Sequence, residues 1–229
     1  EYLINHQASK QGPALKDWKL ENILPALGTR TIHFITESVV KKEPFLICMT
    51  LTSPHTPLAV NPEWKDKSHL NRFADFVMET DWAIGEVMRA LAAQGLDQTT
   101  LLIVTSDNGC SPQAGTPALE KQGHFASAEF RGYKADIWEG GHRVPFLASW
   151  PARIKPGTSS NSTICLNDIF ATCAELLGTK TPPNSCEDSV SFLSALENKP
   201  FPSTRQGIVH HSLSGFFSYR LGDWKLLLA

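Results

Sequence analysis

The sequence predicts an α/β fold in which a mainly parallel sheet is flanked by helices. Compact apolar runs at residues 45–51 and 100–105 have the length and composition of strands buried on both faces. The stretch before each run repeats its apolar residues at the 3.6-residue period of a helix. Helices and strands that alternate in this way are typical of βαβ units, and 229 residues suffice for one large domain or a domain with a small appendage.

The composition is that of a globular protein without the charge of a nucleic-acid or membrane surface. Hydrophobic residues make up 41% and charged residues 19%, the net charge is −2, and no apolar run is long enough to cross a bilayer. None of the five cysteines forms a Cys-x-x-Cys pair, which argues against a structural zinc site. Cys48 lies within an apolar run, so we expect it to be buried.

The elements before residue 100 are delimited by proline and glycine. Residues 1–28 contain several such breakers and are predicted to be a loop with a helical turn. A helix is predicted over residues 29–42, followed by the strand at 45–51, which ends in a loop with two prolines. The clearest helical period covers residues 68–94, with Gly95 placed as the C′ residue.

The elements after residue 105 are shorter. Residues 109–143 form a long connection, which in a compact domain is usually functional or disordered. A strand is predicted at 144–150, a helix at 167–177 that Asn167 caps, and a short helix at 189–197. Three short strands are predicted after two prolines, at 207–211, 216–221 and 224–228, with the hairpin dipeptide Gly222-Asp223 between the last two. We therefore expect residues 1–199 to form one domain and residues 200–229 to begin a small antiparallel subdomain.

The strand at 100–105 is followed by a carboxylate, an amide and a glycine, in Asp107, Asn108 and Gly109. In open α/β sheets, ligands bind beyond the carboxyl ends of the strands. Neighbouring hard oxygen ligands suit Ca²⁺ or Mg²⁺. A plain Asx turn that closes the strand explains the same residues, and for these residues alone it is the more common case.

Three loops that follow strands could converge on one site, at residues 53–57, 106–109 and 130–145. The third holds three cations, Arg131, Lys134 and Arg143, beside two glycines that permit close approach of the backbone. Next to a hard metal ion, such cations favour an anionic substrate. Each piece alone is a weak signal, because a lone histidine such as His55 is more often a structural residue and most lysines and arginines are simply solvated.

Together these segments resemble the sulfatase family, of the arylsulfatase type within the alkaline-phosphatase-like superfamily. The resemblance lies in Phe-Leu-Ile-Cys-Met-Thr-Leu-Thr-Ser-Pro-His-Thr-Pro at 45–57, Leu-Leu-Ile-Val-Thr-Ser-Asp-Asn-Gly at 101–109, the segment 130–145 with Trp150-Pro151 after it, and Tyr-Arg-Leu-Gly-Asp-Trp-Lys-Leu at 219–226. The third segment is the most specific, because Lys134 is followed five residues later by Glu-Gly-Gly and then by Arg-x-Pro.

The resemblance implies a role for four residues. Asp107 and Asn108 match two calcium ligands, Lys134 matches the lysine that holds the sulfate group, and His55 matches the histidine that contacts the sulfate and the leaving-group oxygen. These roles agree with elementary chemistry, since Ca²⁺ takes six to eight oxygens, a lysine stabilises developing negative charge, and a histidine can donate a proton. Second-tier candidates are Arg131, Glu139, His124 and Arg143, of which Glu139 and Arg143 are interpreted as a buried pair that holds the loop.

The family nucleophile is a formylglycine made from the first residue of a Cys/Ser-x-Pro-x-Arg motif. The resemblance places this motif well upstream of the matched segments, with two early aspartate ligands and a further lysine and histidine, and we identify none of these in the sequence. Cys110 begins a Cys-x-Pro sequence but lacks the arginine, and we interpret it as a thiol in the loop after the strand. We therefore expect the C-terminal portion of a sulfatase catalytic domain, which lacks turnover by itself.

The sequence leaves two alternatives open. One is a related hydrolase of phosphate or phosphonate esters, and the other is a non-catalytic truncated paralogue. The resemblance implies a sulfated small molecule or sulfated glycan as substrate, Ca²⁺ in preference to Mg²⁺, and an exported protein.

Overall fold

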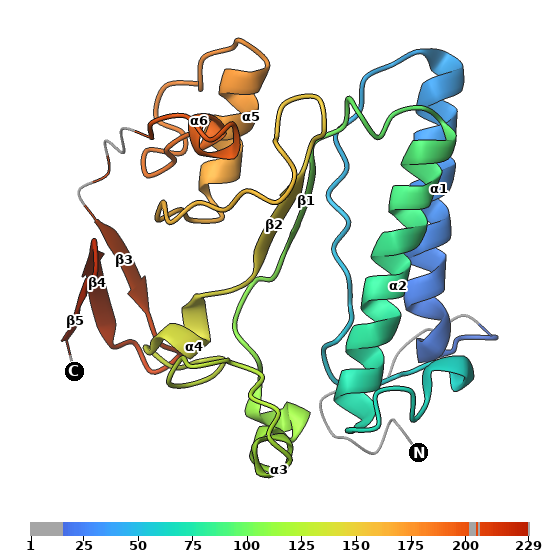
Figure 1. The fold of residues 1–229 in the computed structure, drawn as a ribbon, viewed down its shortest axis with the longest axis vertical. Coiled ribbons are helices and arrows are strands. Elements are labelled where there is room, and N and C mark those ends of the chain that lie inside the picture. Colours follow the sequence, from blue (N-terminus) through green and yellow to red (C-terminus); the bar gives the residue numbers. More distant parts are fainter. Residues whose placement is uncertain (1–15, 202–204, 206, 229) are drawn as a thin grey trace. The chain divides into compact units, whose positions relative to one another are not determined.

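The computed structural model describes residues 16–201, 205 and 207–228. The chain divides into two compact units, which are residues 1–97 with 112–126, and residues 98–111 with 127–229 (Figure 1). Short helical segments punctuate the loops at Leu20–Asn22, Pro62–Trp64, Pro112–Ala114, Thr116–Lys121 (α3) and Glu139–His142 (α4). Among the described residues, no helix combines the length and apolar character needed to cross a membrane.

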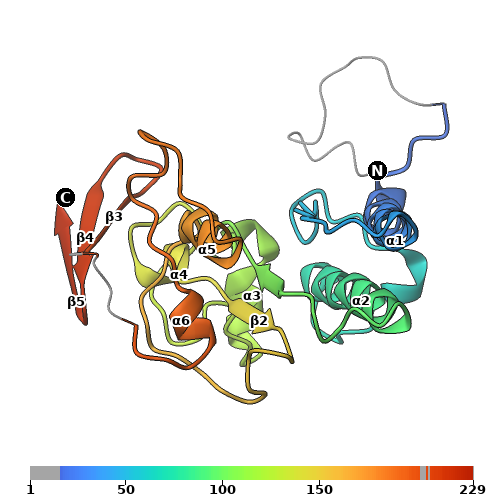
Figure 2. The same cartoon turned by 90° about the horizontal axis from the view of Figure 1, so that it is seen from above.

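The first unit is built on two long helices that lie side by side, α1 (Ile23–Lys41) and α2 (Arg72–Ala93) (Figures 1 and 2). Their apolar faces form two buried clusters, one of Leu24, Phe76 and Ala83 with Val60 from the intervening loop, and one of Ile35, Val87 and Leu91. Helix α1 begins at Ile23, ahead of the predicted start at residue 29. The prediction took Pro25 for a helix breaker. The first turn of a helix tolerates a proline, because no intrahelical bond uses the N–H groups of that turn.

Helix α2 begins at Arg72, four residues after the predicted start, and ends at Ala93, next to the predicted end at residue 94. Asn71 is the N-cap, and its Oδ1 accepts a hydrogen bond from the Ala74 N–H at 2.9 Å. At the other end Gly95 has φ +68°, a left-handed conformation that glycine adopts without steric cost. The predicted C′ position of Gly95 is therefore confirmed.

Residues 45–51 do not form the predicted strand. Phe45, Ile47 and Met49 pack against the helix pair, whereas Leu46 is 82% exposed and Cys48 is exposed as well. The side chains alternate as they would in a strand, but no neighbouring strand pairs with this segment in the described chain. The expectation that Cys48 is buried is wrong, because only every second residue of the run faces the helices.

The second unit contains a pair of strands, β1 (Leu102–Thr105) and β2 (Phe146–Ser149). They are antiparallel, with Thr105 opposite Phe146, and the Thr105 hydroxyl donates to the Pro145 carbonyl at 2.9 Å. Both strands lie where the sequence predicts them. All strand pairs in the described chain are antiparallel, so the described residues contain no parallel pair of the kind predicted. The connection 109–143 returns the chain beside β1 in the opposite direction.

Helix α5 (Asp168–Leu176) is held at its start by Asp168 and not by the predicted cap. Asn167 makes no side-chain cap bond, while the buried Asp168 carboxylate accepts from the Cys165 and Val190 N–H groups and pairs with Arg205. The predicted short helix at 189–197 is reduced to one turn, α6 (Leu193–Leu196).

The three C-terminal strands are confirmed as an antiparallel sheet in the order β3 (Ile208–His211), β4 (Phe217–Leu221) and β5 (Trp224–Leu228). Gly222, with φ +55°, starts the predicted two-residue turn between β4 and β5. Figure 1 shows α4 between β2 and this sheet. The domain boundary near residue 199 stays a prediction.

The cap of α2 gives a test of the helix pair. Asn71→Ala removes the bond to Ala74 and also the bond from Nδ2 to the Ala114 carbonyl at 2.8 Å, and we expect the cap alone to contribute about 0.5–2 kcal/mol to the free energy of unfolding. Asn71→Asp keeps the cap and loses the second bond, so we expect a smaller loss. Urea unfolding of both variants measures the loss in the free energy of unfolding. An equal loss in the two variants would show that the cap contributes nothing.

Candidate active site

The turn after β1 presents the two predicted metal ligands. The Ser106 hydroxyl donates to the Asn108 carbonyl at 3.0 Å, and the Asn108 side-chain NH₂ donates to the Gly109 carbonyl at 3.2 Å. Since the amide nitrogen is used within the turn, the side-chain oxygen of Asn108 remains to face a cation. Asp107 is exposed and its carboxylate can do the same.

Glycines join this turn to the loop that carries Lys134. The Gly109 N–H donates to the Gly141 carbonyl at 3.0 Å, and a Cβ built on Gly109 would overlap the carbonyl group of Gly140. A Cβ on Gly140 would in turn overlap the carbonyl group of Gly132. No larger residue fits at Gly109 or Gly140 without moving main chain, and we call this contact of Gly109 with Gly140 and Gly141 the glycine seam.

Lys134 is fixed beside the strand end through its own main chain. Its N–H donates to the Cys110 carbonyl at 2.8 Å, three residues after Asp107 in the chain. The loop is closed on itself by a bond from the Gly140 N–H to the Arg131 carbonyl at 2.8 Å. The structure therefore brings Asp107, Asn108 and the Lys134 loop together within one unit.

Asp136 supports this loop, and the sequence analysis did not single it out. Its carboxylate accepts from the Tyr133 N–H at 2.9 Å, while the Asp136 N–H donates to the Tyr133 carbonyl at 3.0 Å. These two bonds make a tight turn around Lys134. A signal was present in the sequence, because an aspartate near a glycine is typical of turns that bond to their own backbone.

Glu139 holds the loop as interpreted from the sequence, but its main partners differ from the predicted one. Arg143 is 57% exposed and lies 3.9 Å away, whereas Arg220 and Lys225 contact the two carboxylate oxygens at 2.9 and 3.0 Å. Burial alone would raise the pKa of Glu139, but the Lys225 hydrogen bond and the nearby cations outweigh it and hold that pKa below its usual range. Arg220 and Lys225 are more than 80 residues away in the sequence, so spacing alone could not identify this pairing.

The other two cations of the loop stack on aromatic rings. The Arg131 guanidinium lies 3.7 Å from the centre of the Trp138 ring, and that of Arg143 lies 4.6 Å from the Phe130 ring. Such contacts fix the orientation of a guanidinium and leave its N–H groups able to bind an anion.

His55 and His124 belong to the first unit, so their predicted places near Lys134 stay predictions. His55 is exposed, and its Nδ1 lies 2.6 Å from the Thr56 carbonyl. A carbonyl only accepts, so Nδ1 carries the proton in this contact. A bond between the Ser53 and Thr80 hydroxyls at 2.8 Å ties this loop to α2, whereas His124 is exposed just after α3.

Cys110 has the environment of an inert thiol. It is half-buried, and burial raises its pKa above the usual thiol range. The thiolate is the reactive form of cysteine, so a raised pKa opposes nucleophilic attack. This agrees with the interpretation of Cys110 as a loop thiol.

The sequence analysis overlooked one formal match to Cys/Ser-x-Pro-x-Arg, which is Ser149-Trp-Pro-Ala-Arg153 at the end of β2. Ser149 lies opposite Leu102, at the end of the strand pair remote from Asp107. The three residue steps from Leu102 to Thr105 alone span about 10 Å. Arg153 is already paired with Glu197 and stacked 4.5 Å from the Trp150 ring. Ser149 is therefore too far from the strand end to act there.

The donors at the strand end are of the kind that Ca²⁺ binds, but they are too few to complete its coordination shell. No cluster of three or more His, Cys, Asp or Glu side chains that could hold a metal occurs among the described residues. Ca²⁺ takes six to eight oxygens, so Asp107 and Asn108 alone would fill only part of its coordination shell.

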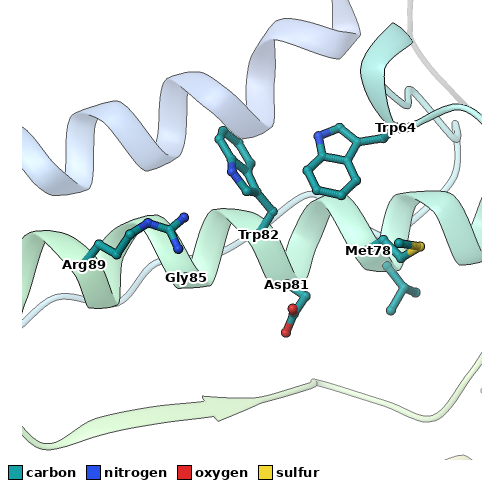
Figure 3. A pocket seen from close by; sticks show the side chains of 7 residues that line it. Trp64, Met78, Asp81, Trp82, Gly85 and Arg89 are labelled. Atoms are coloured by element: carbon teal, nitrogen blue, oxygen red, sulfur yellow. The ribbon is translucent and has the colours of Figure 1, made fainter. Parts of the chain in front are cut away.

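A hollow of about 570 Å³ lies along α2, and it contains none of the predicted site residues. Figure 3 shows Trp64 and Trp82 on one side of the helix and Asp81 pointing away from them. Its lining is completed by Val77, Met78, Gly85 and Arg89. We interpret the hollow as an uneven face of an exposed helix.

Comparison with known proteins decides the family. The Sulfatase family matches residues 19–179, which is more than half of the chain. The chain belongs to the sulfatase family. An N-acetylgalactosamine-6-O-sulfatase of Bacteroides thetaiotaomicron is 34% identical over 213 residues, which are 92% of this chain and 41% of that protein. The steryl-sulfatase of Rattus norvegicus is 34% identical over 168 residues, covering 73% of this chain and 29% of that protein.

Solved structures confirm the alkaline-phosphatase-like fold of the sulfatases. A Bacteroides thetaiotaomicron structure, described with the metabolism of multiple glycosaminoglycans, superposes with a TM-score of 0.83 at 33% identity and covers 92% of this chain and 44% of that one. A sulfatase from Pseudoalteromonas sp. gives a TM-score of 0.76 at 26% identity, with 96% and 44% covered. The chain thus spans less than half the length of these relatives.

A histidine pair beside Glu139 makes the stability of this sulfatase chain depend on pH. The rings of His142 and His210 lie 4.2 Å apart, and burial, followed by the Lys225 charge, lowers the pKa of His210 to about 4 and that of His142 below its usual value. The unfolded chain takes up these protons near pH 6.5 and the folded chain only at lower pH, so the stability contribution is complete above pH 6.5 and is lost as the pH falls toward 4.

We expect His210 alone to lower the free energy of unfolding by about 2–3 kcal/mol between pH 7 and pH 4. Urea unfolding over that pH range measures this change. His210→Gln, which does not titrate, should flatten this slope. An identical slope in the variant would show that His210 is not the group responsible.

Proposed function

We propose that the complete protein that carries this chain hydrolyses sulfate esters of a glycan in a calcium-dependent reaction. One observation supports this above the others, which is the main-chain bond that fixes Lys134 next to the strand end of Asp107 and Asn108. A cation and two hard oxygen donors are thereby carried by two loops that contact each other through main chain. That combination suits an anionic group bound between a lysine and a metal ion.

In this proposal Lys134 binds the sulfate oxygens. Its ammonium carries three N–H donors on a flexible stem, while its backbone is fixed by the Cys110 carbonyl and the turn around Asp136. A preorganised cation stabilises the charge that develops on the oxygens in the transition state. Arg131 and Arg143, fixed on Trp138 and Phe130, are further donors for negative groups of the substrate.

His55 is proposed to contact the leaving-group oxygen. With Nδ1–H committed to the Thr56 carbonyl, Nε2 is the atom that would face the substrate. A protonated Nε2 can transfer its proton to the departing alkoxide, which lowers the barrier to cleavage of the ester.

Asp107 and Asn108 are proposed to hold part of the calcium shell. A bound Ca²⁺ would supply positive charge beside the sulfate group. For the nucleophile, Cys110 has a raised pKa and Ser149 lies at the wrong end of the strands, so we propose that a formylglycine outside residues 1–229 supplies it. Residues 1–229 alone would then have no turnover.

Relatives of this chain support a sulfated glycan as the substrate class. The Bacteroides relative is an N-acetylgalactosamine-6-O-sulfatase, and the structure of Ps i-CgsB, 26% identical with a TM-score of 0.76, is a complex with k-i-k-neocarrahexaose. A phosphonate monoester hydrolase from Silicibacter pomeroyi is 19% identical with a TM-score of 0.51, so it shows a shared fold alone. Turnover of a 6-sulfated amino sugar but not of phosphate or phosphonate monoesters by the full-length protein tests the proposal. A preference for the phosphorus esters would overturn it.

Replacement of Lys134 tests its role directly. We expect Lys134→Ala in the full-length protein to lower kcat for a sulfate ester about 10²- to 10³-fold, the usual effect of losing one preorganised electrostatic contact. Lys155→Ala removes an exposed lysine of the same unit and should leave kcat within about twofold. An unchanged kcat in Lys134→Ala would remove Lys134 from the mechanism.

The partial calcium shell predicts weak binding by residues 1–229 alone. Two protein ligands leave most of the six to eight positions to water, so calorimetric titration should show a Kd no tighter than about 10⁻³ M. Asp107→Ala should abolish even this binding. Tight binding of one Ca²⁺ per chain would contradict the proposal that further ligands lie outside these residues.

A further inference from the structure

The cross-strand neighbours Arg220 and Lys225 stand in an unusual pairing. They lie directly opposite each other on β4 and β5, and like charges in that position repel and destabilise a sheet. Glu139 resolves the repulsion, because Arg220 contacts its Oε2 at 2.9 Å and Lys225 contacts its Oε1 at 3.0 Å. Each carboxylate oxygen therefore serves one cation of the hairpin.

This triad is shielded from water, unlike most surface ion pairs. The side chains of Lys225, Arg220 and Glu139 are 11%, 20% and 26% exposed. Breaking a shielded pair is costly because it leaves the remaining charges without a partner, whereas an exposed pair contributes little. The triad therefore acts as a firm link between the C-terminal sheet and α4.

A second link joins the same sheet to the residue after Lys134. The Leu213 N–H, in the connection between β3 and β4, donates to the Ala135 carbonyl at 3.0 Å. Ala135 has φ +79°, a conformation that an alanine keeps only when its surroundings impose it. The sheet thus holds the segment that follows Lys134 at both ends, by main chain at Ala135 and by charge at Glu139.

We infer that Arg220 and Lys225 are positioning residues for Lys134, acting through Glu139 and the glycine seam. The inference rests on the proposed function of Lys134 in binding the sulfate group. Glu139 begins α4, and the next two residues, Gly140 and Gly141, form the contact with Gly109 at the strand end. A displaced Glu139 carries these glycines with it and moves Lys134 away from Asp107. The sheet is therefore part of the sulfate-binding apparatus without touching the sulfate.

Lys225→Met in the full-length protein tests this inference, because it removes the charge and keeps most of the stem. We expect kcat/KM for a sulfate ester to fall about tenfold to a hundredfold, and inhibition by inorganic sulfate to weaken by a similar factor, since small misplacements of a binding group have effects of this size. Lys225→Arg should restore most of both. Lys199→Met, which removes an exposed lysine that pairs with Glu197, is the matched control and should change neither.

Hydrogen exchange separates positioning from general loss of structure. In Lys225→Met we expect faster exchange over residues 131–141, including the Lys134 and Gly140 amides, and unchanged exchange in α2. Arg220→Gln removes the other cation and gives the same test if Lys225→Met does not fold.

Unchanged exchange over residues 131–141 would overturn the link itself. Faster exchange with kcat/KM and sulfate inhibition at the level of the wild type would overturn the positioning role. A full-length wild type without activity on sulfate esters would overturn the proposed function, and with it the positioning of a sulfate-binding lysine, whereas the exchange result would still show whether the link exists.

Discussion

The glycine seam is the constraint on which the candidate active site depends. A carboxylate and an amide at the end of β1 are useful to a metal only if a third element approaches closely, and a Cβ at Gly109 or Gly140 would prevent that approach. Because the seam is made of main chain, it fixes the loop without using any of the side chains that chemistry needs. Lys134 can then be anchored by its own N–H on the Cys110 carbonyl.

The rest of the second unit keeps the seam closed. Hydrogen bonds around Asp136 and Arg131 shape the loop from inside, and the C-terminal sheet holds it from outside through Ala135 and Glu139. The cations form two groups, since Arg131 and Arg143 stack on aromatic rings whereas Arg220 and Lys225 pair with Glu139. Membership of the sulfatase family provides the chemical context for the first group, and the C-terminal sheet provides the two cations of the second group.

The sequence analysis located most elements but not their pairing. Period and punctuation placed α2, Gly95 and the three C-terminal strands correctly, because these signals are local. The strand at 45–51 was wrong, since an apolar run shows that burial occurs but not whether a partner strand is present. At the site, the resemblance of motifs pointed to Asp107, Asn108 and Lys134, and the structure brings these together. The partners of Glu139 lie more than 80 residues away, a distance at which only the folded chain shows what is close.

The measurement that tests the central claim most directly is the turnover of a sulfate ester by the Gly109→Ala variant of the full-length protein. The added Cβ would overlap the Gly140 carbonyl group and separate the metal ligands from Lys134, so we predict that kcat/KM at saturating calcium falls about 100-fold while the protein stays folded. Gly28→Ala is the control, because it adds the same methyl group in open space at a helical position of α1. A Gly109→Ala protein with the kcat/KM of the wild type would contradict the claim that the seam holds the site together.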